Sequence, residues 1–378
     1  MFRPLDQEIA SEETAQSAAV QAWSELQQTW IEPGRVTVLK SKTNSQVYRL
    51  EDVGPAGRAV IAKKCPLATA RVERLIYTRF LPLAPVPALQ FYGFLEDADG
   101  QGRFKKGTAR GEDGSSPPGT VFDREKSGDK PSRPLFESAL AGGRFAWLFL
   151  EEAEGQAYSP SSDEHRALAG RWLGTIHRAA RGADFQAELP DLGPGHYLEC
   201  LRAARTKLRE HMDNPVLRPG DVAQLEASAE QCDVVEAHWG ELEQCCDRMP
   251  RVVAHDDFAA KNVRVCPGPT GPALLVFDWE HAGWGLPAID LAAVGEYTVS
   301  PDLATYATAL IRDFPDVTVQ DIQSWEACGK ILRLIDSIYW TTFRLVFESY
   351  EWLERPLSSL TIYQVRMDQS LRALNWVT

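Results

Sequence analysis

The chain has 378 residues, 44% of them hydrophobic and 25% charged, and carries a formal net charge of −13. These values are typical of a globular protein with one large or two coupled domains, and they exclude a disordered or fibrous chain. The acidic charge argues against a general nucleic-acid or anionic-membrane binder, which needs a basic surface.

The first residues carry no apolar stretch long enough for a signal peptide or a membrane span, so we expect a cytoplasmic protein. The seven cysteines are scattered, and none has the C-x-x-C spacing of a zinc or redox site. We interpret them as thiols in a reducing compartment.

The start of the chain predicts a helical extension. Within residues 11–30, apolar side chains such as Trp23 and Leu26 recur at helical spacing. Pro33-Gly34 then ends the run. We therefore expect residues 1–34 to form an N-terminal helical segment that packs on the next part of the chain.

Residues 35–150 predict a small lobe with a β-sheet and one helix. From Arg35 onward the hydrophobic period changes to two, as in half-buried strands. The expected strands lie at 36–38, 47–50, 59–63, 88–95 and 145–150, and the expected helix lies at 68–80. Between the last two strands, a segment at about 97–143 is rich in Gly, Ser, Pro, Asp and Lys, which predicts a flexible surface insertion.

Residues 151–378 predict a larger, mainly helical lobe. The expected helices lie at 163–180, 194–212, 220–248, 301–313, 319–352 and 357–374. The exception is a hairpin over 263–277, where two apolar runs flank a Pro/Gly turn. A small β-rich lobe followed by a helical lobe would place a natural ligand site in the cleft between them.

One loop of the second lobe carries the residue types that phosphoryl transfer needs. It reads His255-Asp256-Asp257-Phe258-Ala259-Ala260-Lys261-Asn262, and Asp278 follows after the hairpin. Phosphoryl transfer requires a carboxylate to orient the attacking hydroxyl, oxygen ligands for Mg²⁺ and positive charge on the phosphates. Asp257, Asn262 and Asp278 offer the carboxylate and the hard oxygen ligands that suit Mg²⁺.

These residues resemble the motifs of protein kinases and of the aminoglycoside phosphotransferase family. His255-x-Asp257-x-x-x-x-Asn262 matches the catalytic loop H-x-D-x-x-x-x-N. Asp278-Trp279-Glu280 looks like the D-W-E form of the aminoglycoside phosphotransferase relatives, and Asp290-Leu291-Ala292 is similar to their D-L-A. The resemblance implies an α+β, protein-kinase-like bilobal fold, with a small antiparallel β lobe and a larger helical lobe.

The same resemblance implies a role for each matching residue. Asp257 would be the catalytic base, and Asn262 and Asp278 would be metal ligands. Asp290 would brace the backbone of the catalytic loop. His255 would support the loop from beneath rather than take part in the chemistry.

The first lobe offers matching contacts for a nucleotide. Val60-Ile61-Ala62-Lys63 resembles the V-A-I-K element, whose lysine holds the α- and β-phosphates, and Glu73 in the next helix would be its ion-pair partner. Lys64 is a rival, because strand alternation turns only one of two adjacent lysines toward the cleft. We expect Lys63, which follows three apolar residues.

Two further segments would contact the nucleotide. The turn at 41–46 lacks the G-x-G-x-x-G of protein kinases and resembles the polar turn of the aminoglycoside phosphotransferase relatives, so Ser41 and Asn44 would approach the phosphates. An ordinary hairpin turn is the alternative. Glu151 and Ala153 lie at the lobe junction, where the hinge of this fold offers backbone groups to a purine, and ATP and GTP stay equally open.

Other positions depart from the family pattern. Asp256 replaces the glycine of the common H-G-D form, and we expect its carboxylate to point to solvent rather than to raise the pKa of Asp257. Ala259 stands where protein kinases place a lysine, two residues after the base. Lys261 would either supply that charge from a different position or be an exposed lysine, and both interpretations stay open.

We therefore expect an ATP- or GTP-dependent phosphotransferase that uses Mg²⁺ to move the γ-phosphoryl group to a hydroxyl of a small polar molecule. Aminoglycoside-like antibiotics and other metabolites are candidate acceptors, and an acidic surface would help to gather a cationic one. The alternatives are a kinase-fold binding or regulatory module without turnover and an atypical protein kinase. The absence of a glycine-rich loop and of an A-P-E element argues against the protein kinase. No nucleic-acid, membrane or obligate protein partner is expected.

Overall fold

The computed structural model describes residues 7–8, 17–42, 45–97, 144–295 and 297–377. Contacts within the chain separate it into two compact units. The first comprises Met1–Ala70 and Tyr92–Glu152, and the second comprises Arg71–Phe91 and Ala153–Thr378. A β-sheet dominates the first unit and helices dominate the second, which confirms the expected α+β class.

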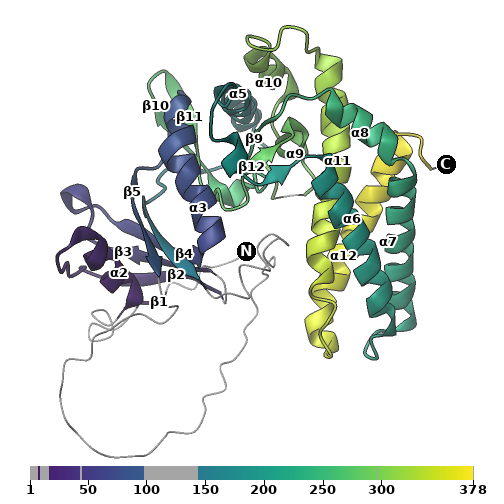
Figure 1. Ribbon diagram of the computed structural model, residues 1–378, viewed down its shortest axis with the longest axis horizontal. Coiled ribbons are helices and arrows are strands. Elements are labelled where there is room, and N and C mark those ends of the chain that lie inside the picture. The colour runs from purple at the N-terminus through teal and green to yellow at the C-terminus, as the bar shows by residue number, and fades with distance from the viewer. Residues whose placement is uncertain (1–6, 9–16, 43–44, 98–143, 296, 378) are drawn as a thin grey trace, which may run out of the picture. The chain divides into compact units, whose positions relative to one another are not determined.

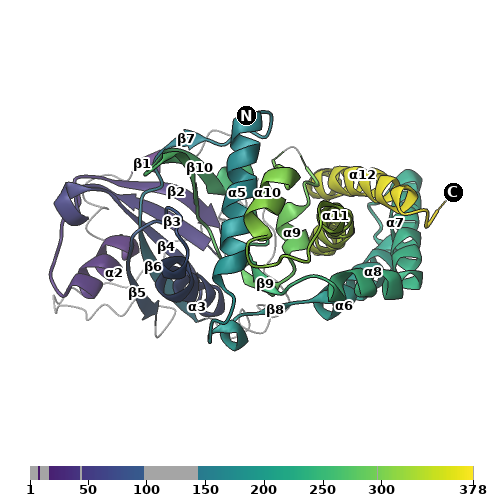
Figure 2. The same ribbon diagram turned by 90° about the horizontal axis from the view of Figure 1, so that it is seen from above.

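The first unit is built on a six-stranded sheet in the order β1-β2-β3-β4-β6-β5 (Figures 1 and 2). Its strands are β1 (Gln7–Glu8), β2 (Val36–Lys42), β3 (Ser45–Leu50), β4 (Val60–Pro66), β5 (Phe91–Asp97) and β6 (Phe145–Glu151). The neighbours β2–β3, β3–β4 and β4–β6 pair antiparallel. All five predicted strands are present, although the one expected from Ala88 begins at Phe91.

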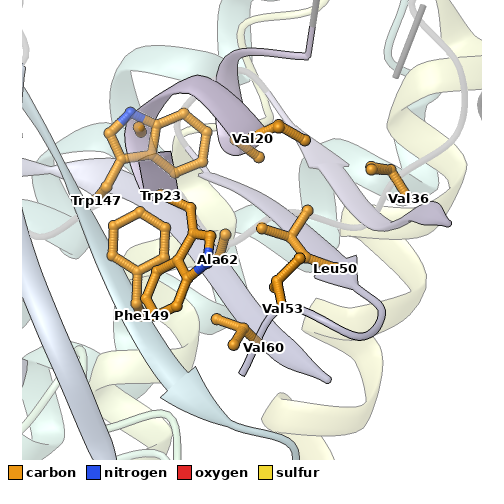
Figure 3. Packing of buried hydrophobic residues seen from close by; sticks show 11 residues of the cluster. Val20, Trp23, Val36, Leu50, Val53, Val60, Ala62, Trp147 and Phe149 are labelled. Atoms are coloured by element: carbon orange, nitrogen blue, oxygen red, sulfur yellow. The ribbon is translucent and has the colours of Figure 1, made fainter. Parts of the chain in front are cut away.

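One face of this sheet is covered by α2 (Ala18–Gln27), which lies within the predicted helical extension. Gln7–Glu8, which were expected in the same helical extension, form the strand β1 instead. The Trp23 ring lies 5.1 Å from the Phe149 ring, within a cluster of buried apolar side chains that joins the helix to the strands (Figure 3). At Gly93 of β5, a Cβ atom would lie 2.4 Å from a methyl carbon of Leu26. A glycine is therefore needed for this close approach.

Three predicted segments lie wholly or partly outside the described residues. They are residues 1–6 and 9–16 of the helical extension, Asn44 in the expected phosphate-binding turn, and nearly all of the expected insertion, over 98–143. The predicted helix 68–80 is present as α3 (Leu67–Leu75), which continues as a π-helical turn from Ile76 to Phe80.

The second unit contains most of the helices and two small three-stranded sheets, ordered β11-β10-β7 and β8-β12-β9. Its remaining helices are α5 (Asp163–Ala179), α6 (Pro194–Glu210), α7 (Pro219–Ala237), α8 (Trp239–Asp247), α9 (Pro287–Leu291), α10 (Leu303–Leu310), α11 (Val319–Thr342) and α12 (Tyr350–Ala373). Its strands are β7 (Gln156–Ala157), β8 (Asp191–Leu192), β9 (Val252–Ala254), β10 (Val263–Gly268), β11 (Gly271–Val276) and β12 (Gly283–Gly285).

Four long helices of this unit lie side by side as a bundle, in the order α11, α6, α7 and α12, with α12 returning to α11 (Figures 1 and 2). The apolar faces of these helices bury one another. No described helix has an apolar stretch that would let it traverse a lipid bilayer.

The boundaries of three predicted helices were wrong. The helix expected over 220–248 is broken at His238, whose backbone angles of φ −100° and ψ 13° end α7 and start α8. The helix expected over 319–352 ends at Thr342. The last helix begins at Tyr350, seven residues before the predicted start, because α12 accommodates Pro356 inside its second turn.

The short helix α9 is positioned by α11. At Gly329 of α11, a Cβ atom would lie 2.1 Å from the Ala288 carbonyl oxygen, so only a glycine lets the two helices come this close. Ala288 is two residues before Asp290 on α9. The packing of α11 therefore fixes the segment that carries this aspartate.

Candidate active site

The catalytic loop and Asp278 are brought together by the hairpin β10–β11, which confirms the hairpin predicted over 263–277. Val263 pairs with Val276 in the antiparallel register. One residue outside this pair, the Phe277 N–H donates to the Asn262 carbonyl at 3.1 Å. The ladder thus holds the end of the loop next to the start of the Asp278-Trp279-Glu280 segment.

Asp257 is held by two neighbours in its own loop. The Asn262 side-chain amide donates to the Asp257 carbonyl oxygen and to its Oδ2, both at 3.0 Å. The Lys261 ammonium lies 2.8 Å from the same Oδ2. Only 7% of the Asp257 surface is exposed. A buried carboxylate with two donors on one oxygen has a fixed orientation.

The sequence left open whether Lys261 is an exposed lysine or supplies the charge near Asp257, and the structure shows both features. Its side chain is 65% exposed, yet the ammonium forms an ion pair with Asp257. Desolvation lowers the pKa of Lys261, but the negative charges of Asp257 and, further away, of Asp278 outweigh this and raise the pKa above its usual value. Ala259 stands where protein kinases place a lysine. Lys261, two residues later, supplies a positive charge to Asp257 instead.

His255 lies fully buried beneath the loop, and both of its ring nitrogens have partners. Nε2 lies 3.2 Å from the Phe277 carbonyl oxygen, so it carries the proton, and Nδ1 accepts the Asp257 N–H at 3.3 Å. Burial lowers the pKa of the imidazole, although Asp290 and Asp257 pull it back upward. A neutral ring with both nitrogens engaged suits support of the backbone.

Asp290 holds the first turn of the loop. Its two carboxylate oxygens accept the backbone N–H groups of His255, at 2.7 Å, and of Asp256, at 2.9 Å. On the other side, His177 Nε2 lies 3.4 Å from Asp290, and the Tyr306 hydroxyl lies 3.0 Å from His177 Nδ1. This buried chain of hydrogen bonds fixes the loop against α5 and α10.

Asp256 does not point to solvent, which corrects the expectation from the sequence. Only 5% of its surface is exposed, and its Oδ1 lies 3.4 Å from the Tyr197 hydroxyl of α6. Its carbonyl oxygen accepts a hydrogen bond from the Arg333 guanidinium of α11 at 3.1 Å. Because Asp290 also holds its N–H, the residue is enclosed by α6, α9 and α11.

Two aspartates of the site adopt left-handed backbone conformations. Asp256 has φ 61° and Asp278 has φ 66°. Residues other than glycine rarely adopt this region, and they persist there only where the surroundings enforce it. Trp279 supplies such enforcement for Asp278, because its fully buried ring packs 4.5 Å from the His255 ring and 5.9 Å from the Trp172 ring.

In the first unit, strand β4 turns the side chains of the adjacent Lys63 and Lys64 to opposite faces of the sheet. Lys64 lies opposite Trp147 in the β4–β6 register, and its ammonium forms an ion pair with Asp97 at 2.9 Å. Lys63 therefore faces the other side of the sheet, where it is 5% exposed. Glu73 is 1% exposed on α3. The predicted Lys63–Glu73 ion pair stays a prediction.

The other expected nucleotide contacts lie at strand ends of the first unit and just after it. Ser41 was expected in a turn but lies in β2, paired with Gln46 of β3. Glu151 is the last residue of β6, and its carboxylate binds Arg58 at 2.5 Å. Ala153 follows two residues later and begins the second segment of the helical unit.

The donor set around the loop fits a divalent magnesium ion. The Asn262 side-chain nitrogen faces Asp257, which turns its carbonyl oxygen away from that carboxylate. Asp278 adds a carboxylate at the adjoining segment. Amide and carboxylate oxygens are hard ligands of the kind that Mg²⁺ prefers, and Mg²⁺ needs only one or two such protein contacts.

Sequence reasoning missed three residues that hold the loop in place. Tyr197 and Arg333 act on Asp256 from helices far away in sequence, and no motif spacing points to them. His177 could have been identified from the sequence, because it lies on the apolar face of its helix with Leu173 and Ile176. A histidine on a buried stripe needs a polar partner, which here is Asp290.

The family model described as "Phosphotransferase enzyme family" matches residues 35–326. Among solved structures, a choline kinase from Cryptosporidium parvum Iowa II is 11% identical, with a TM-score of 0.53 over 90% of this chain and 91% of that one. An ethanolamine kinase from Plasmodium vivax is 13% identical, with a TM-score of 0.53 over 87% and 81%. The GDP and kanamycin complex of APH(2″)-IIIa is 11% identical, with a TM-score of 0.54 over 91% and 97%. These likenesses confirm the kinase-like fold. No curated protein matches the sequence.

Proposed function

Because the chain belongs to the phosphotransferase enzyme family, we propose that it moves the γ-phosphoryl group of ATP or GTP to a hydroxyl of a small polar molecule. The observation that carries this proposal is the catalytic loop itself. Asp257 is buried, oriented by Asn262 and Lys261, and fixed in space through the bonds that Asp290 makes to the preceding backbone. A module without turnover has no need for such preorganisation.

In this proposal Asp257 orients the acceptor hydroxyl and receives its proton as the new phosphate ester bond forms. Phosphoryl transfer passes through a loose transition state, so positioning matters more than covalent chemistry. Lys261 pairs with this carboxylate and would place a positive charge beside the reacting atoms. His255 holds the Asp257 N–H and takes no proton, because its Nε2–H is donated to a carbonyl oxygen.

Asn262 and Asp278 would hold Mg²⁺, which would neutralise charge on the phosphate oxygens when bound. Lys63 would contact the α- and β-phosphates, and Glu73 would be its ion-pair partner. Support comes from burial: a lysine 5% exposed and a glutamate 1% exposed both require a counter-charge.

The backbone at Glu151 and Ala153 would contact the purine, and Ser41 and Asn44 would approach the phosphates. Choline, ethanolamine and kanamycin, named with the structural relatives, each combine a hydroxyl with a cationic nitrogen. The net charge of −13 would favour approach of such a compound. We therefore propose a cationic hydroxyl compound as the acceptor class.

Replacing Asp257 tests the proposal. In a panel of hydroxylated amines with ATP or GTP, Asp257→Asn should lower turnover by about 100- to 10,000-fold, because the base is lost. Mg-nucleotide binding, followed by thermal shift, should persist. Asp247→Asn, at an exposed position at the end of α8, is the matched control and should leave turnover unchanged. Equal turnover of the Asp257→Asn protein and the wild type would refute the assignment.

A further inference from the structure

Outside the candidate active site, three metal-ligating side chains converge between α6 and α11. They are His196 and Cys200 on α6 and Asp336 on α11, and their ligand atoms all lie within 4.8 Å of one another. His196 and Cys200 are four residues apart, which places both on one face of the helix. Their Nε2 and Sγ atoms are 3.7 Å apart.

Asp336 is a buried carboxylate with little to balance its charge. It is 6% exposed, and Trp340 Nε1 donates to its Oδ1 at 2.9 Å. Within the described part of the chain, no lysine or arginine forms an ion pair with it. A buried charge is costly unless it is paired or coordinates a metal. The indole N–H orients the carboxylate in the way that outer-shell donors orient metal ligands.

We propose that His196, Cys200 and Asp336 form a binding site for Zn²⁺. Imidazole, thiolate and carboxylate together suit this borderline ion, and three protein ligands leave a fourth position for water. Bond lengths of about 2.0–2.3 Å separate ligand atoms by roughly 3.5 Å in a tetrahedral site, close to the His196–Cys200 spacing. Binding would draw the three ligand atoms, which all lie within 4.8 Å of one another, to this spacing.

The site has an entry path and a structural consequence. His196 is only partly buried, so an ion can reach the cluster from solvent. The next residue, Tyr197, contacts Asp256, and Arg333 lies one turn before Asp336 on α11 and binds the Asp256 carbonyl oxygen. A metal here would link α6 and α11, two of the three helices that enclose Asp256.

Cobalt substitution tests this site without reference to activity. Untagged full-length protein, stripped with a chelator, is titrated with Co²⁺ and monitored for the thiolate-to-cobalt charge-transfer band. We expect the band in the wild type at a stoichiometry of about one ion per chain, and displacement by Zn²⁺. Absence of the band in the folded wild-type protein would overturn the proposal.

Two variants separate the site from unspecific thiol binding. Cys200→Ser should abolish the band, whereas Cys232→Ser, a similarly buried thiol on α7, should leave it unchanged. A melting temperature that rises with Zn²⁺ in the wild type and the Cys232→Ser protein, but not in the Cys200→Ser protein, would support the same assignment. Retention of the band in the Cys200→Ser protein would contradict it.

A second proposal concerns two cysteines that lie close together between α8 and α11. Cys245 on α8 and Cys328 on α11 have sulfur atoms 2.8 Å apart, although both are free thiols. A disulfide has a sulfur–sulfur length of about 2.05 Å, so little movement would join them. The hydrogen bond from Cys328 lowers the pKa of Cys245, and Cys245 is partly exposed. Low pKa and access are the features of an oxidisable thiol.

We infer that peroxide converts this pair to a disulfide. The Cys245 thiolate attacks the peroxide O–O bond and forms a sulfenic acid, releasing hydroxide; the Cys328 sulfur then displaces the sulfenic oxygen as water. One peroxide is reduced to two waters, and two thiols are oxidised to one disulfide. The new bond would link α8 to α11 beside Gly329, whose packing positions α9.

Peptide mapping after peroxide treatment tests the pair. We expect one cross-linked peptide that joins Cys245 to Cys328 and loses two hydrogen masses, reversible with dithiothreitol. Cys328→Ser should eliminate it, and Cys266→Ser, which changes a partly exposed thiol on β10, should not. Failure to detect this peptide in fully folded, peroxide-treated wild type would overturn the inference.

Discussion

Asp256 has a backbone conformation that favours glycine, yet its side chain is buried and contacts α6. The residue has φ 61°, is 5% exposed and contacts Tyr197. Asp tolerates the left-handed region better than most residues do, because its short polar side chain bonds locally. Contacts with α6 and α11 therefore hold the aspartate that replaces the glycine of the H-G-D form, and its side chain does not point to solvent.

Two substitutions at Asp256 separate backbone strain from side-chain contact. Asp256→Ala removes the carboxylate and keeps the unfavourable φ, whereas Asp256→Gly removes both. We expect the glycine variant to be more stable than the alanine variant by about 1–2 kcal/mol in urea unfolding. Equal stabilities would mean that the backbone is unstrained at this position.

His255 predicts a dependence of stability on pH. Burial depresses its pKa in the folded protein, so below the ordinary value of 6.5 the unfolded chain binds a proton that the folded protein does not. The stability contributed by the neutral ring is therefore complete above pH 6.5 and is lost as the pH falls toward the folded pKa.

Urea unfolding at about pH 7 and about pH 5 measures this contribution. Relative to His255→Gln, the wild type should lose additional stability over this range, by at most about 1.4 kcal/mol per pH unit. A difference between the two proteins that is the same at both pH values would show that His255 is not the group involved.

The adjacent lysines of β4 offer a matched pair for nucleotide binding. Lys63→Met should raise the KM for nucleotide by about 10- to 100-fold, because a charge-assisted bond to phosphate is lost. Lys64→Met should leave KM unchanged and cost at most about 1 kcal/mol, since it loses a partly exposed ion pair with Asp97. Steady-state kinetics with both variants decide the assignment, and the reverse pattern would transfer the role to Lys64.

Among the helices and strands, the sequence predicted those that depend on local patterns of residues. The strands β2 to β6, the helix α5 and the β10–β11 hairpin follow from periodicity and turn residues. The strands β8, β9 and β12 hold only two or three residues each and are set by their partners in space, so periodicity cannot reveal them. The helix ends at His238 and Thr342 were missed because neither histidine nor threonine is a strong helix breaker.

The contact between α9 and α11 gives a prediction at this scale. Gly329→Ala would place a methyl carbon against the Ala288 carbonyl and should destabilise the fold by about 1–3 kcal/mol. Gly220→Ala, in the first turn of α7 with no atom within 4 Å of the new Cβ, is the control. It should be neutral or stabilising by up to about 1 kcal/mol, because alanine favours helices. Comparable unfolding midpoints for both variants would contradict this account of the packing.

For the whole molecule, the residues of the candidate catalytic motif could be predicted from the sequence, but the residues that surround them could not. His255, Asp257, Asn262 and Asp278 follow one another at fixed spacings, and the hairpin register brings the last two together. Tyr197 and Arg333 reach the loop only through packing of the helical bundle, which no local pattern encodes.

The most direct test of the central proposal is transfer of a labelled phosphoryl group. Wild-type protein is incubated with Mg²⁺, a panel of hydroxylated amines and ATP carrying ¹⁸O in its γ-phosphate, and the products are read by mass spectrometry. We expect a labelled phosphate monoester with wild type and with Asp247→Asn, and about 100- to 10,000-fold slower formation of it with Asp257→Asn. A labelled ester formed equally well by Asp257→Asn would contradict the proposal.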